Sequence, residues 1–339
     1  MTASFPLLKL PLIAQRAIIE QLDFLDLLQL SMKSSTIKRR LELWKLSVQT
    51  MNFLNNEKSY WISIMQNYNR SYIYAYDYVP KGTVTELANI QGEPVQIWNI
   101  RNGLRVKSDL SEVATLETIT KYILSVCKVK KYTLTSSKTE IRNLFIWQIT
   151  TQLDKLHISS SPSSSSSSTA PQLAKISPED LVFILEEISV ALLHISVDCP
   201  GFKYQRTIRH PAIYIHRPRW IDFDQFSLGA ETITANFSHQ KVSVDVLNRL
   251  IKDWTEGKNP KLREVLFKWK EYDGASWAMA QEHETRPPKP VLPNRNVEPL
   301  KGLCINHRMT HRFLSQSVYY EVRLSVEEDL GLNGIHLED

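Results

Sequence analysis

Residues 5–41 read FPLLKLPLIAQRAIIEQLDFLDLLQLSMKSSTIKRRL, and this stretch decides the fold of the N-terminus. Most of its residues between Phe5 and Met32 are hydrophobic, whereas the whole chain of 339 residues is 42% hydrophobic. The apolar residues recur at the three- and four-residue spacing of helices. We therefore expect a small helical unit at this end of the chain.

Three helix starts can be placed within the stretch. Pro11 suits the first turn of a helix, where a missing backbone N–H costs nothing. Asp23 is expected to cap a second helix, and Asp26 three residues later strengthens the capping pattern. Ser35 is expected to cap a third helix, whose apolar positions recur as far as Trp44. The prediction is a three-helix unit that ends near Trp44.

The first two predicted helices are apolar on more than one side. Helices of this size bury one stripe each, and surplus apolar surface on a small unit usually marks a partner or the rest of the chain. Periodicity does not choose between a docking module and a helical cap on the following domain. Both interpretations stay open on this evidence.

The same stretch resembles an F-box, and specifically the F-boxes of a large nematode family. The matching features are, in order, Phe5-Pro6-Leu7-Leu8, Leu10-Pro11, Ile18-Ile19, Leu22-Asp23, Asp26-Leu27-Leu28 and Leu30-Ser31, followed by Ser34, Ser35 and Lys38. The stretch departs from the family at Ile13 and Ala14, where many F-boxes carry an acidic residue. The resemblance implies a module of three helices that packs on the Skp-type adaptor of a ubiquitin ligase. The residues that it implies to face the adaptor are Pro6, Leu10, Pro11, Ile18, Leu22, Leu27 and Leu28.

Short strands are predicted from Val129 onward, because apolar residues recur in a loose pattern typical of half-buried strands. The predicted strands are centred on Val129-Tyr132-Leu134, Leu153-Leu156-Ile158, Val190-Leu193-Ile195, Ile213-Ile215, Ile233 to Phe237 and Leu262-Val265-Phe267. Their spacing of roughly 20–30 residues is typical of leucine-rich-repeat solenoids. A non-repetitive α/β domain is the alternative.

Helices are predicted between several of these strands. One lies around Ile141 to Gln148. Another begins at the Ser177-Pro178 cap, and a third begins at Ser243 and stops at Gly257. The fold class is therefore α+β with several domains: a three-helix F-box followed by an irregular α/β domain that is leucine-rich-repeat-like.

A second resemblance covers residues 211–267. The segments Arg219-Trp220-Ile221, Val246 to Trp254 and Gly257 to Leu262 are similar to the F-box-associated domain (type 2) of the same nematode family. There a helix that ends in Trp is followed by a Gly/Asn-Pro-Lys-Leu turn into a strand. The resemblance implies that the C-terminal domain recognises a substrate. The predicted organisation is an F-box at 1–46, a connecting region at 47–125 and an F-box-associated domain at 126–339.

Two stretches of biased composition interrupt the predicted C-terminal domain. The first, residues 159–169, is serine-rich and cannot bury a core, so we expect a solvated loop there. It is either a tolerated insertion or a loop controlled by phosphorylation. The second, residues 286–299, is rich in proline and is expected to be an extended connector.

Composition excludes several classes of function. A net charge of +5 argues against nucleic acid as the main partner, because phosphate binding usually needs a concentrated basic face. Three widely spaced cysteines argue against a disulfide framework and indicate a reducing, intracellular compartment, cytoplasm or nucleus. No stretch is long and apolar enough to span a bilayer, so no membrane partner is expected.

A basic segment offers a candidate substrate site. Arg206, Arg209, Arg217 and Arg219 lie close together in the sequence, and no acidic residue of that segment accounts for their charge. Arginine clusters of this kind bind acidic or phosphorylated motifs. The alternative is a solvated strand edge, where basic residues are common.

Cys304, His307 and His311 have a spacing that invites a zinc interpretation, with the two histidines on one helix face. A structural zinc site needs four ligands, and no second Cys pair lies nearby, so we predict no metal and no cofactor. No nucleophile–base motif or Gly-rich phosphate loop is found.

We therefore expect a non-catalytic subunit: a substrate-recognition adaptor of a Skp–cullin–F-box type ubiquitin ligase. Its N-terminal helices would bind the Skp-type adaptor and, through it, a cullin, and its C-terminal domain would bind an unknown protein substrate. The alternative is a repeat protein that binds phosphopeptides or RNA, whose N-terminal helices cap the solenoid.

Overall fold

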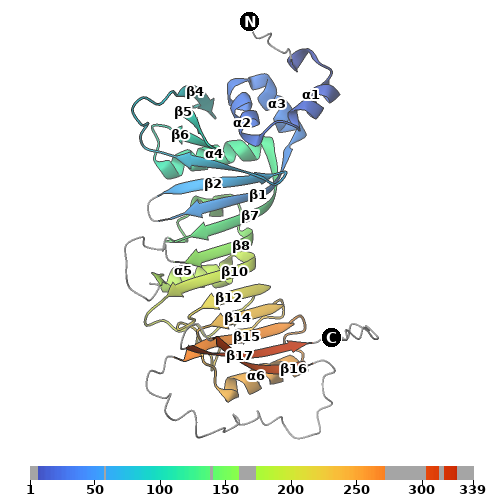
Figure 1. Ribbon diagram of the computed structural model, residues 1–339, viewed down its shortest axis with the longest axis vertical. Coiled ribbons are helices and arrows are strands. Elements are labelled where there is room, and N and C mark those ends of the chain that lie inside the picture. The colour runs from blue at the N-terminus through green and yellow to red at the C-terminus, as the bar shows by residue number, and fades with distance from the viewer. Residues whose placement is uncertain are drawn as a thin grey trace. The chain divides into compact units, whose positions relative to one another are not determined.

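The computed structural model describes residues 7–56, 59–137, 140–159, 173–271, 303–312 and 317–326 (Figure 1). The chain divides into two compact units, residues 1–155 (unit 1) and residues 156–339 (unit 2), and each is described by itself. Three helices at the N-terminus are followed by a large, mostly β-sheet part. The predicted mixed α+β class is confirmed at this level.

The three predicted N-terminal helices are present. They are α1 (Leu12–Ile19), α2 (Phe24–Lys33) and α3 (Ser35–Trp44), and a short 3-10 turn, η1 (Leu7–Lys9), precedes them. Pro11 stands immediately before α1. The Asp23 carboxylate accepts a hydrogen bond from the backbone N–H of Leu25 and caps α2 as expected.

The capping residue of α3 was predicted wrongly by one position. The hydroxyl of Ser34 accepts a hydrogen bond from the backbone N–H of Ile37, while Ser35 is the first helical residue. Ser34 has extended backbone angles (φ −131°, ψ 108°), which an N-cap residue requires. Two adjacent serines gave the sequence pattern no means of choosing between them.

Unit 1 contains a seven-stranded mixed sheet in the order β7-β1-β2-β3-β6-β5-β4. The strands are β1 (Leu46–Asn55), β2 (Tyr60–Gln66), β3 (Asn69–Ala75), β4 (Glu86–Ile90), β5 (Glu93–Ile100), β6 (Gly103–Lys107) and β7 (Cys127–Ser136). The neighbours β1–β2, β2–β3, β5–β6 and β4–β5 are antiparallel, whereas β1–β7 and β3–β6 are parallel. Most of this sheet comes from residues 47–125, for which the sequence predicted only a connection.

Helix α4 (Glu112–Val126) covers one face of that sheet (Figure 1). Its buried residues Leu116, Ile119 and Ile123 belong to the same core as Ile62 and Ile73 of the strands, all at most 1% exposed. Side chains alternate between the two faces of a strand, so the intervening residues lie on the opposite face of the sheet.

Unit 2 contains four parallel strands that neighbour one another in chain order: β10 (Ser189–Asp198), β12 (Ala212–His216), β14 (Thr234–Ser238) and β15 (Glu264–Glu271). Leu192, Ala212, Thr234 and Glu264 occupy equivalent positions on these strands, and the interval to the next strand is longest between Thr234 and Glu264. Two antiparallel strands, β17 (Ser317–Val326) and β16 (Leu303–Arg312), complete the edge beyond β15.

Among the remaining elements, β8 (Gln152–Ser159), α5 (Pro178–Val182) and α6 (Val244–Thr255) were predicted, whereas the two-residue strands β9 (Ala174–Lys175), β11 (Thr207–Ile208) and β13 (Ser227–Leu228) were not. Strand β8 spans the boundary of the two units. Helix α5 continues into a π-helical turn, η3 (Phe183–Glu187). Ser243 caps α6, and Gly257 follows with a φ of +74°. The helix predicted around residues 141–148 is only a 3-10 turn, η2 (Phe145–Gln148).

A ladder of side chains at equivalent positions forms the core of unit 2. Ile195, Ile215, Phe237 and Phe267 pair in register, and each is fully buried. The rings of Phe237 and Phe267 stack with their centroids 5.2 Å apart. Residues 160–169 of the predicted serine-rich loop, the proline-rich stretch 286–299 and Pro6 lie outside the described residues.

Candidate functional site

Three neighbouring exposed apolar side chains gather on η1 and the start of α1, whereas α3 carries the single strongly exposed Leu43. Ile13 is 85% exposed, Leu12 59% and Leu8 44%. Together with Leu10 and Pro11 they form what is called here the α1 surface. Figure 1 shows α1 (dark blue) at the outer end of unit 1, beyond α2 and α3. Apolar surface of this kind on a small helical module marks a contact site.

A buried glutamine holds the chain that leads into α1. The Gln15 side chain is 1% exposed, and its Nε2 donates hydrogen bonds to the carbonyl oxygens of Leu8 (3.3 Å) and Leu10 (2.5 Å). These bonds connect η1 to the second turn of α1. The Leu-Pro dipeptide is therefore held in one conformation with its apolar neighbours directed outward.

The predicted adaptor-facing residues fall into two groups. Pro11 is exposed, and Leu10, Ile18 and Leu22 are half-buried, so all four offer surface to a partner. Leu27 and Leu28 are only 1% and 2% exposed. Both leucines lie in the core of unit 1, where no partner reaches them.

Helix α2 is fixed within unit 1 by polar contacts as well as by its leucines. The Tyr122 hydroxyl of α4 donates a hydrogen bond to the Ser31 Oγ over 2.9 Å. Gln29 donates to the Asn99 side chain over 2.8 Å, and Lys33 forms an ion pair with Glu86. Helix α4 and strands β4 and β5 thus hold α2, which explains why its apolar face is not free.

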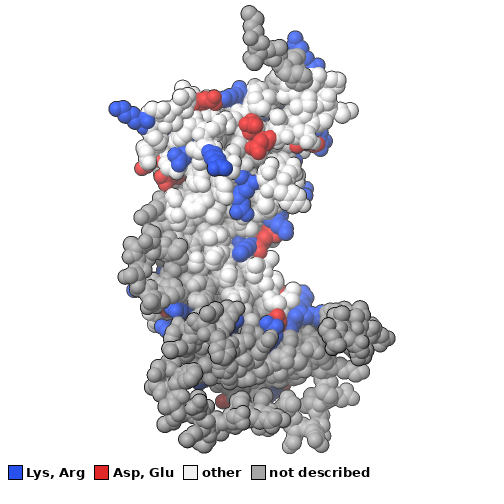
Figure 2. All heavy atoms as spheres, in the orientation of Figure 1, with Lys and Arg blue, Asp and Glu red and all other residues white. Residues whose placement is uncertain are grey.

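A polar groove of about 630 Å³ lies between the start of α2 and the ends of β3, β5 and β6. Asp23 and Asp26 line it from the helix, and Arg70 and Asn99 line it from the strands. Charges of both signs therefore meet in it. Over the visible face of the described residues, basic and acidic side chains are likewise interspersed (Figure 2).

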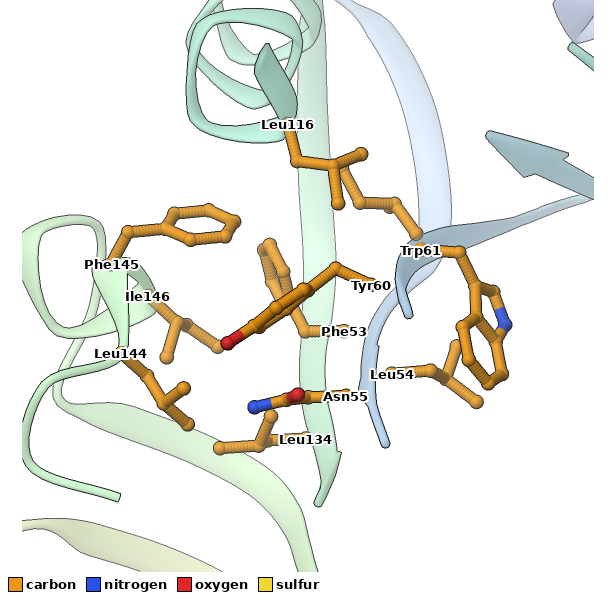
Figure 3. Close-up of a pocket in the computed structure, with 11 residues that line it drawn as sticks. Phe53, Leu54, Asn55, Tyr60, Trp61, Leu116, Leu134, Leu144, Phe145 and Ile146 are labelled. Carbon is orange, nitrogen blue, oxygen red and sulfur yellow. The ribbon is translucent and has the colours of Figure 1, made fainter. Parts of the chain in front are cut away.

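A small apolar cavity of about 20 Å³ lies beside Asn55, between β1, β2, α4 and η2 (Figure 3). Asn55 is 5% exposed, and neither its amide oxygen nor its amide nitrogen has a hydrogen-bond partner. Figure 3 shows this amide and the Tyr60 hydroxyl both directed toward Leu144. The volume has room for about one water molecule, which would satisfy the amide. It has no room for an organic ligand.

The four arginines of the predicted substrate site lie on two segments of the chain. Arg206 and Arg209 flank β11, and Arg217 and Arg219 follow β12. The chain after β12 returns beside the start of the first segment, because Tyr204 pairs with Ile221 and Lys203 Nζ donates to the carbonyl oxygen of Arg219 over 2.8 Å. Both oxygens of the Glu186 carboxylate accept hydrogen bonds from Arg206 Nη1, at 3.0 and 2.8 Å. The acidic partner of Arg206 thus comes from η3, outside the basic segment.

The zinc interpretation placed His307 and His311 on one face of a helix, and the structure shows that this placement is wrong. Cys304, His307 and His311 all lie in strand β16 rather than on a helix. The two histidines therefore share no helix face. No group of three or more His, Cys, Asp or Glu side chains that could hold a metal ion is found within the described ranges.

The two described cysteines are buried free thiols. Burial raises the pKa of Cys127 to about 12 and also raises the pKa of Cys199. A thiol with a raised pKa carries little thiolate near neutral pH and is a poor nucleophile. No helix among the described residues is long and apolar enough to cross a membrane.

A tyrosine-bearing face of the unit 1 sheet was not predicted from the sequence. Residues 71–78 read SYIYAYDY, with tyrosine at every second position, which is the period of a strand with one aromatic face. In the structure Tyr72, Tyr74 and Tyr76 lie on the face of the unit 1 sheet opposite α4. The alternation was visible in the sequence, but no strand was predicted there.

Comparison with known proteins gives no support for either resemblance. No family model, no curated protein and no solved structure matches this chain.

Proposed function

We propose that this protein is a substrate-recognition adaptor of a Skp–cullin–F-box type ubiquitin ligase. The observation that carries the proposal is the α1 surface, whose leucines and isoleucine stand exposed at the Leu-Pro position where an F-box contacts its adaptor. The role is non-catalytic and intracellular. Transfer would depend on holding a substrate lysine close to a loaded ubiquitin carrier, which raises its effective concentration.

The structure narrows the proposed docking residues. Leu10, Pro11, Ile18 and Leu22 remain candidates, because their side chains offer surface beside Leu12 and Ile13. Leu27 and Leu28 are better assigned to the core that positions α1. A polar substitution at Leu27 would unfold unit 1, so it does not test docking.

A leucine-rich-repeat-like character for unit 2 belongs to the same proposal. It is supported by parallel strands that neighbour one another in chain order at spacings of roughly 20–30 residues. Side chains on the uncovered face of such a sheet are free to contact a target protein. We assign substrate recognition to the sheet faces rather than to the arginines, because Arg206 is already paired with Glu186.

The test is capture of a purified Skp-type adaptor by the full-length chain and by two matched variants. Leu12→Asp places a charge on the α1 surface, where Leu12 is 59% exposed, and Leu43→Asp places the same charge on α3, where Leu43 is 81% exposed. Removing one buried leucine from an interface costs about 1.5–3 kcal/mol, which is roughly a 10- to 100-fold loss of affinity. Leu12→Asp should show this loss, and Leu43→Asp should bind like the unaltered chain. Equal capture by all three chains would exclude docking through α1.

A second candidate function is favoured by one observation. The burial of Leu27 and Leu28 is what a helical cap on a repeat protein requires, and such a protein would bind phosphopeptide or RNA without an adaptor. This alternative predicts no adaptor capture by the unaltered chain. It also predicts that binding to RNA weakens steeply as salt is raised.

A further inference from the structure

A continuous row of side chains crosses the face of the unit 1 sheet opposite α4. Strand pairing places Leu54, Trp61, Tyr74, Arg105 and Trp98 opposite one another on successive strands. Trp98 is only 5% exposed, so the accessible part of the row runs from Leu54 to Arg105. Tyr72 and Tyr76 flank Tyr74 on β3. These side chains together are called here the aromatic row. Ile62, Ile73, Leu104 and Ile97, on the opposite face of the same strands, form the core with α4.

The rings of the aromatic row lie against one another. Trp61 and Tyr74 have centroids 6.1 Å apart and planes inclined by 26°, and Tyr72 and Tyr74 have centroids 6.1 Å apart and planes inclined by 25°. Stacked rings cover each other's faces and leave their edges outward. The tyrosine hydroxyls, at the far ends of side chains that stand off the sheet, are therefore what a partner meets.

The Tyr74 hydroxyl is a hydrogen-bond donor at ordinary pH. The pKa of Tyr74 is raised, chiefly by burial and then by its neighbours Tyr72 and Tyr76. A phenol that stays protonated donates a hydrogen bond to a carboxylate or a carbonyl oxygen.

Arg105, the cation of the aromatic row, forms no ion pair with a carboxylate of the described residues. The Arg105 guanidinium lies 4.6 Å from the centroid of the Tyr76 ring, and its Nε is buried without a hydrogen-bond partner. The cross-strand pairs on either side of Arg105, Ser63–Tyr72 and Gln96–Lys107, contain no aspartate or glutamate. The positive charge of Arg105 is therefore not balanced by a carboxylate of these neighbouring positions.

We infer that the aromatic row binds an extended acidic peptide segment of a protein partner. Arg105 would pair with a carboxylate, the tyrosine hydroxyls would bond to carboxylate or backbone oxygens, and Trp61 would pack on an intervening apolar side chain. Tyrosine, tryptophan and arginine are the residues that carry most binding energy in protein interfaces. The inference rests on the proposed role in substrate recognition and supplies the chemical class of the substrate.

Single-stranded nucleic acid fits this face less well. It also needs basic and aromatic residues, but it stacks its bases on free ring faces. In the aromatic row Trp61 and Tyr72 each stack with Tyr74, so fewer ring faces are left for bases. An acidic peptide uses the edges and hydroxyls that are left.

The experiment measures binding of three fluorescent probes to the full-length chain by anisotropy at low and raised salt. The probes are a random copolymer of glutamate and tyrosine, a copolymer of lysine and tyrosine, and oligo-deoxythymidine. The variants are Arg105→Gln, Tyr74→Phe and, as a matched control, Arg101→Gln. Arg101 is exposed in the turn between β5 and β6, so its substitution removes the same charge from the same hairpin outside the row.

We expect the glutamate–tyrosine copolymer alone to bind, and Arg105→Gln to weaken it about tenfold or more, as the loss of a charge-assisted hydrogen bond predicts. Tyr74→Phe keeps the ring and should weaken binding by a smaller factor. Arg101→Gln should bind within about twofold of the unaltered chain. Unchanged circular dichroism in each variant shows that the fold is retained.

Three results would overturn the inference. They are no binding of the acidic copolymer, equal losses in Arg105→Gln and Arg101→Gln, and tighter binding of the oligonucleotide, which would favour nucleic acid. Adaptor capture is measured separately through the α1 surface. A chain that captures the adaptor but ignores the acidic copolymer overturns only this inference, whereas the reverse result overturns only the proposed adaptor role.

Discussion

Both units carry aromatic residues paired across neighbouring strands, but on different sides of their sheets. In unit 2 the stacked pair Phe237–Phe267 lies on the buried face, with Phe223 and Phe226 packed edge-on against Phe237 at centroid distances of 5.4 and 5.7 Å. In unit 1 the stacked pair Trp61–Tyr74 lies on the face opposite α4 and is only half-buried. The buried set is entirely phenylalanine, whereas the half-buried set carries hydroxyl and indole N–H groups.

The difference shows how side-chain chemistry separates a core from a binding face when the geometry of pairing is alike. Phenylalanine has no polar atom to satisfy, so complete burial costs it nothing. Tyrosine and tryptophan need a partner for their polar ends when they are buried, and they suit a surface that is apolar at its base and polar at its edge. The same pairing therefore stabilises the fold in unit 2 and presents a contact surface in unit 1.

The largest effect is expected from removing a ring of the buried set. Phe237 is fully buried, and Phe237→Ala should lower the free energy of unfolding by about 3–5 kcal/mol, because it removes apolar contacts and leaves a cavity. Urea unfolding and hydrogen exchange of peptides from β12 and β14 measure the loss.

The matched change on the other sheet is Tyr74→Ala. Tyr74 is half-buried, so this variant should lose clearly less stability, about 1–2 kcal/mol, as removal of a cross-strand pair predicts. Equal losses in the two variants would contradict the contrast, since the aromatic row would then be a second core.

The second effect concerns how α2 is held in unit 1. Tyr122→Phe removes the hydroxyl that donates to Ser31 and leaves the buried ring in place. The Ser31 hydroxyl still donates to the carbonyl oxygen of Leu28, so no donor is orphaned. We expect a loss of about 1 kcal/mol in the free energy of unfolding. Stability equal to that of the unaltered chain would show that this bond does not help to fix α2.

The parts of this fold that could be predicted from the sequence are those whose sequence pattern acts over a few neighbouring residues. Helix ends marked by Asp23, Ser177 and Ser243 were placed correctly, because a capping side chain bonds to a backbone N–H two or three residues away. The four parallel strands β10, β12, β14 and β15 were also found, because each carries its own apolar alternation, whereas β16 and β17 were not predicted.

The sheet of unit 1 was not predicted, and the reasons are physical. Its order brings β6 beside β3 and β7 beside β1, pairings over long separations that no local pattern encodes. The burial of Leu27 and Leu28 followed from the same omission. A helix whose covering sheet is unknown presents an apolar face without a partner, so these leucines were assigned to the adaptor.

The candidate site was predictable only in part for a related reason. Exposure of Leu12 and Ile13 depends on α1 lying beyond α2 and α3, which is a tertiary fact. The four arginines are close in sequence, but the ion pair between Arg206 and Glu186 of η3 is formed only in the fold. The aromatic row needs the register of five strands before Arg105 and Tyr74 are seen to be neighbours.

The smallest expected effect is on the pH dependence of stability. It concerns the sheet faces that lie opposite the buried cores, which carry tyrosines in unit 1 and histidines in unit 2. Desolvation, and then the charges of His239, Arg217 and His194, lowers the pKa of His216 from 6.5 to about 4. Its Nδ1 lies 2.9 Å from the Ser238 hydroxyl, and its ring lies 4.4 Å from that of His239. Above pH 6.5 the residue is neutral in both the folded and the unfolded chain, so it contributes no pH dependence there.

As the pH falls below 6.5, the unfolded chain binds a proton at His216 that the folded chain resists, so stability declines until the pH approaches 4. His216→Gln keeps a polar group beside Ser238 and removes this titration. Its urea midpoint should therefore fall less between about pH 7.5 and about pH 5 than that of the unaltered chain, while His210, whose pKa is also lowered by burial, retains part of the slope. Parallel pH profiles for the two chains would show that His216 is as well solvated when folded as when unfolded. The uncovered face of unit 2 would then be more open than its half-buried histidine implies, and closer to the aromatic row of unit 1 in its access to a partner.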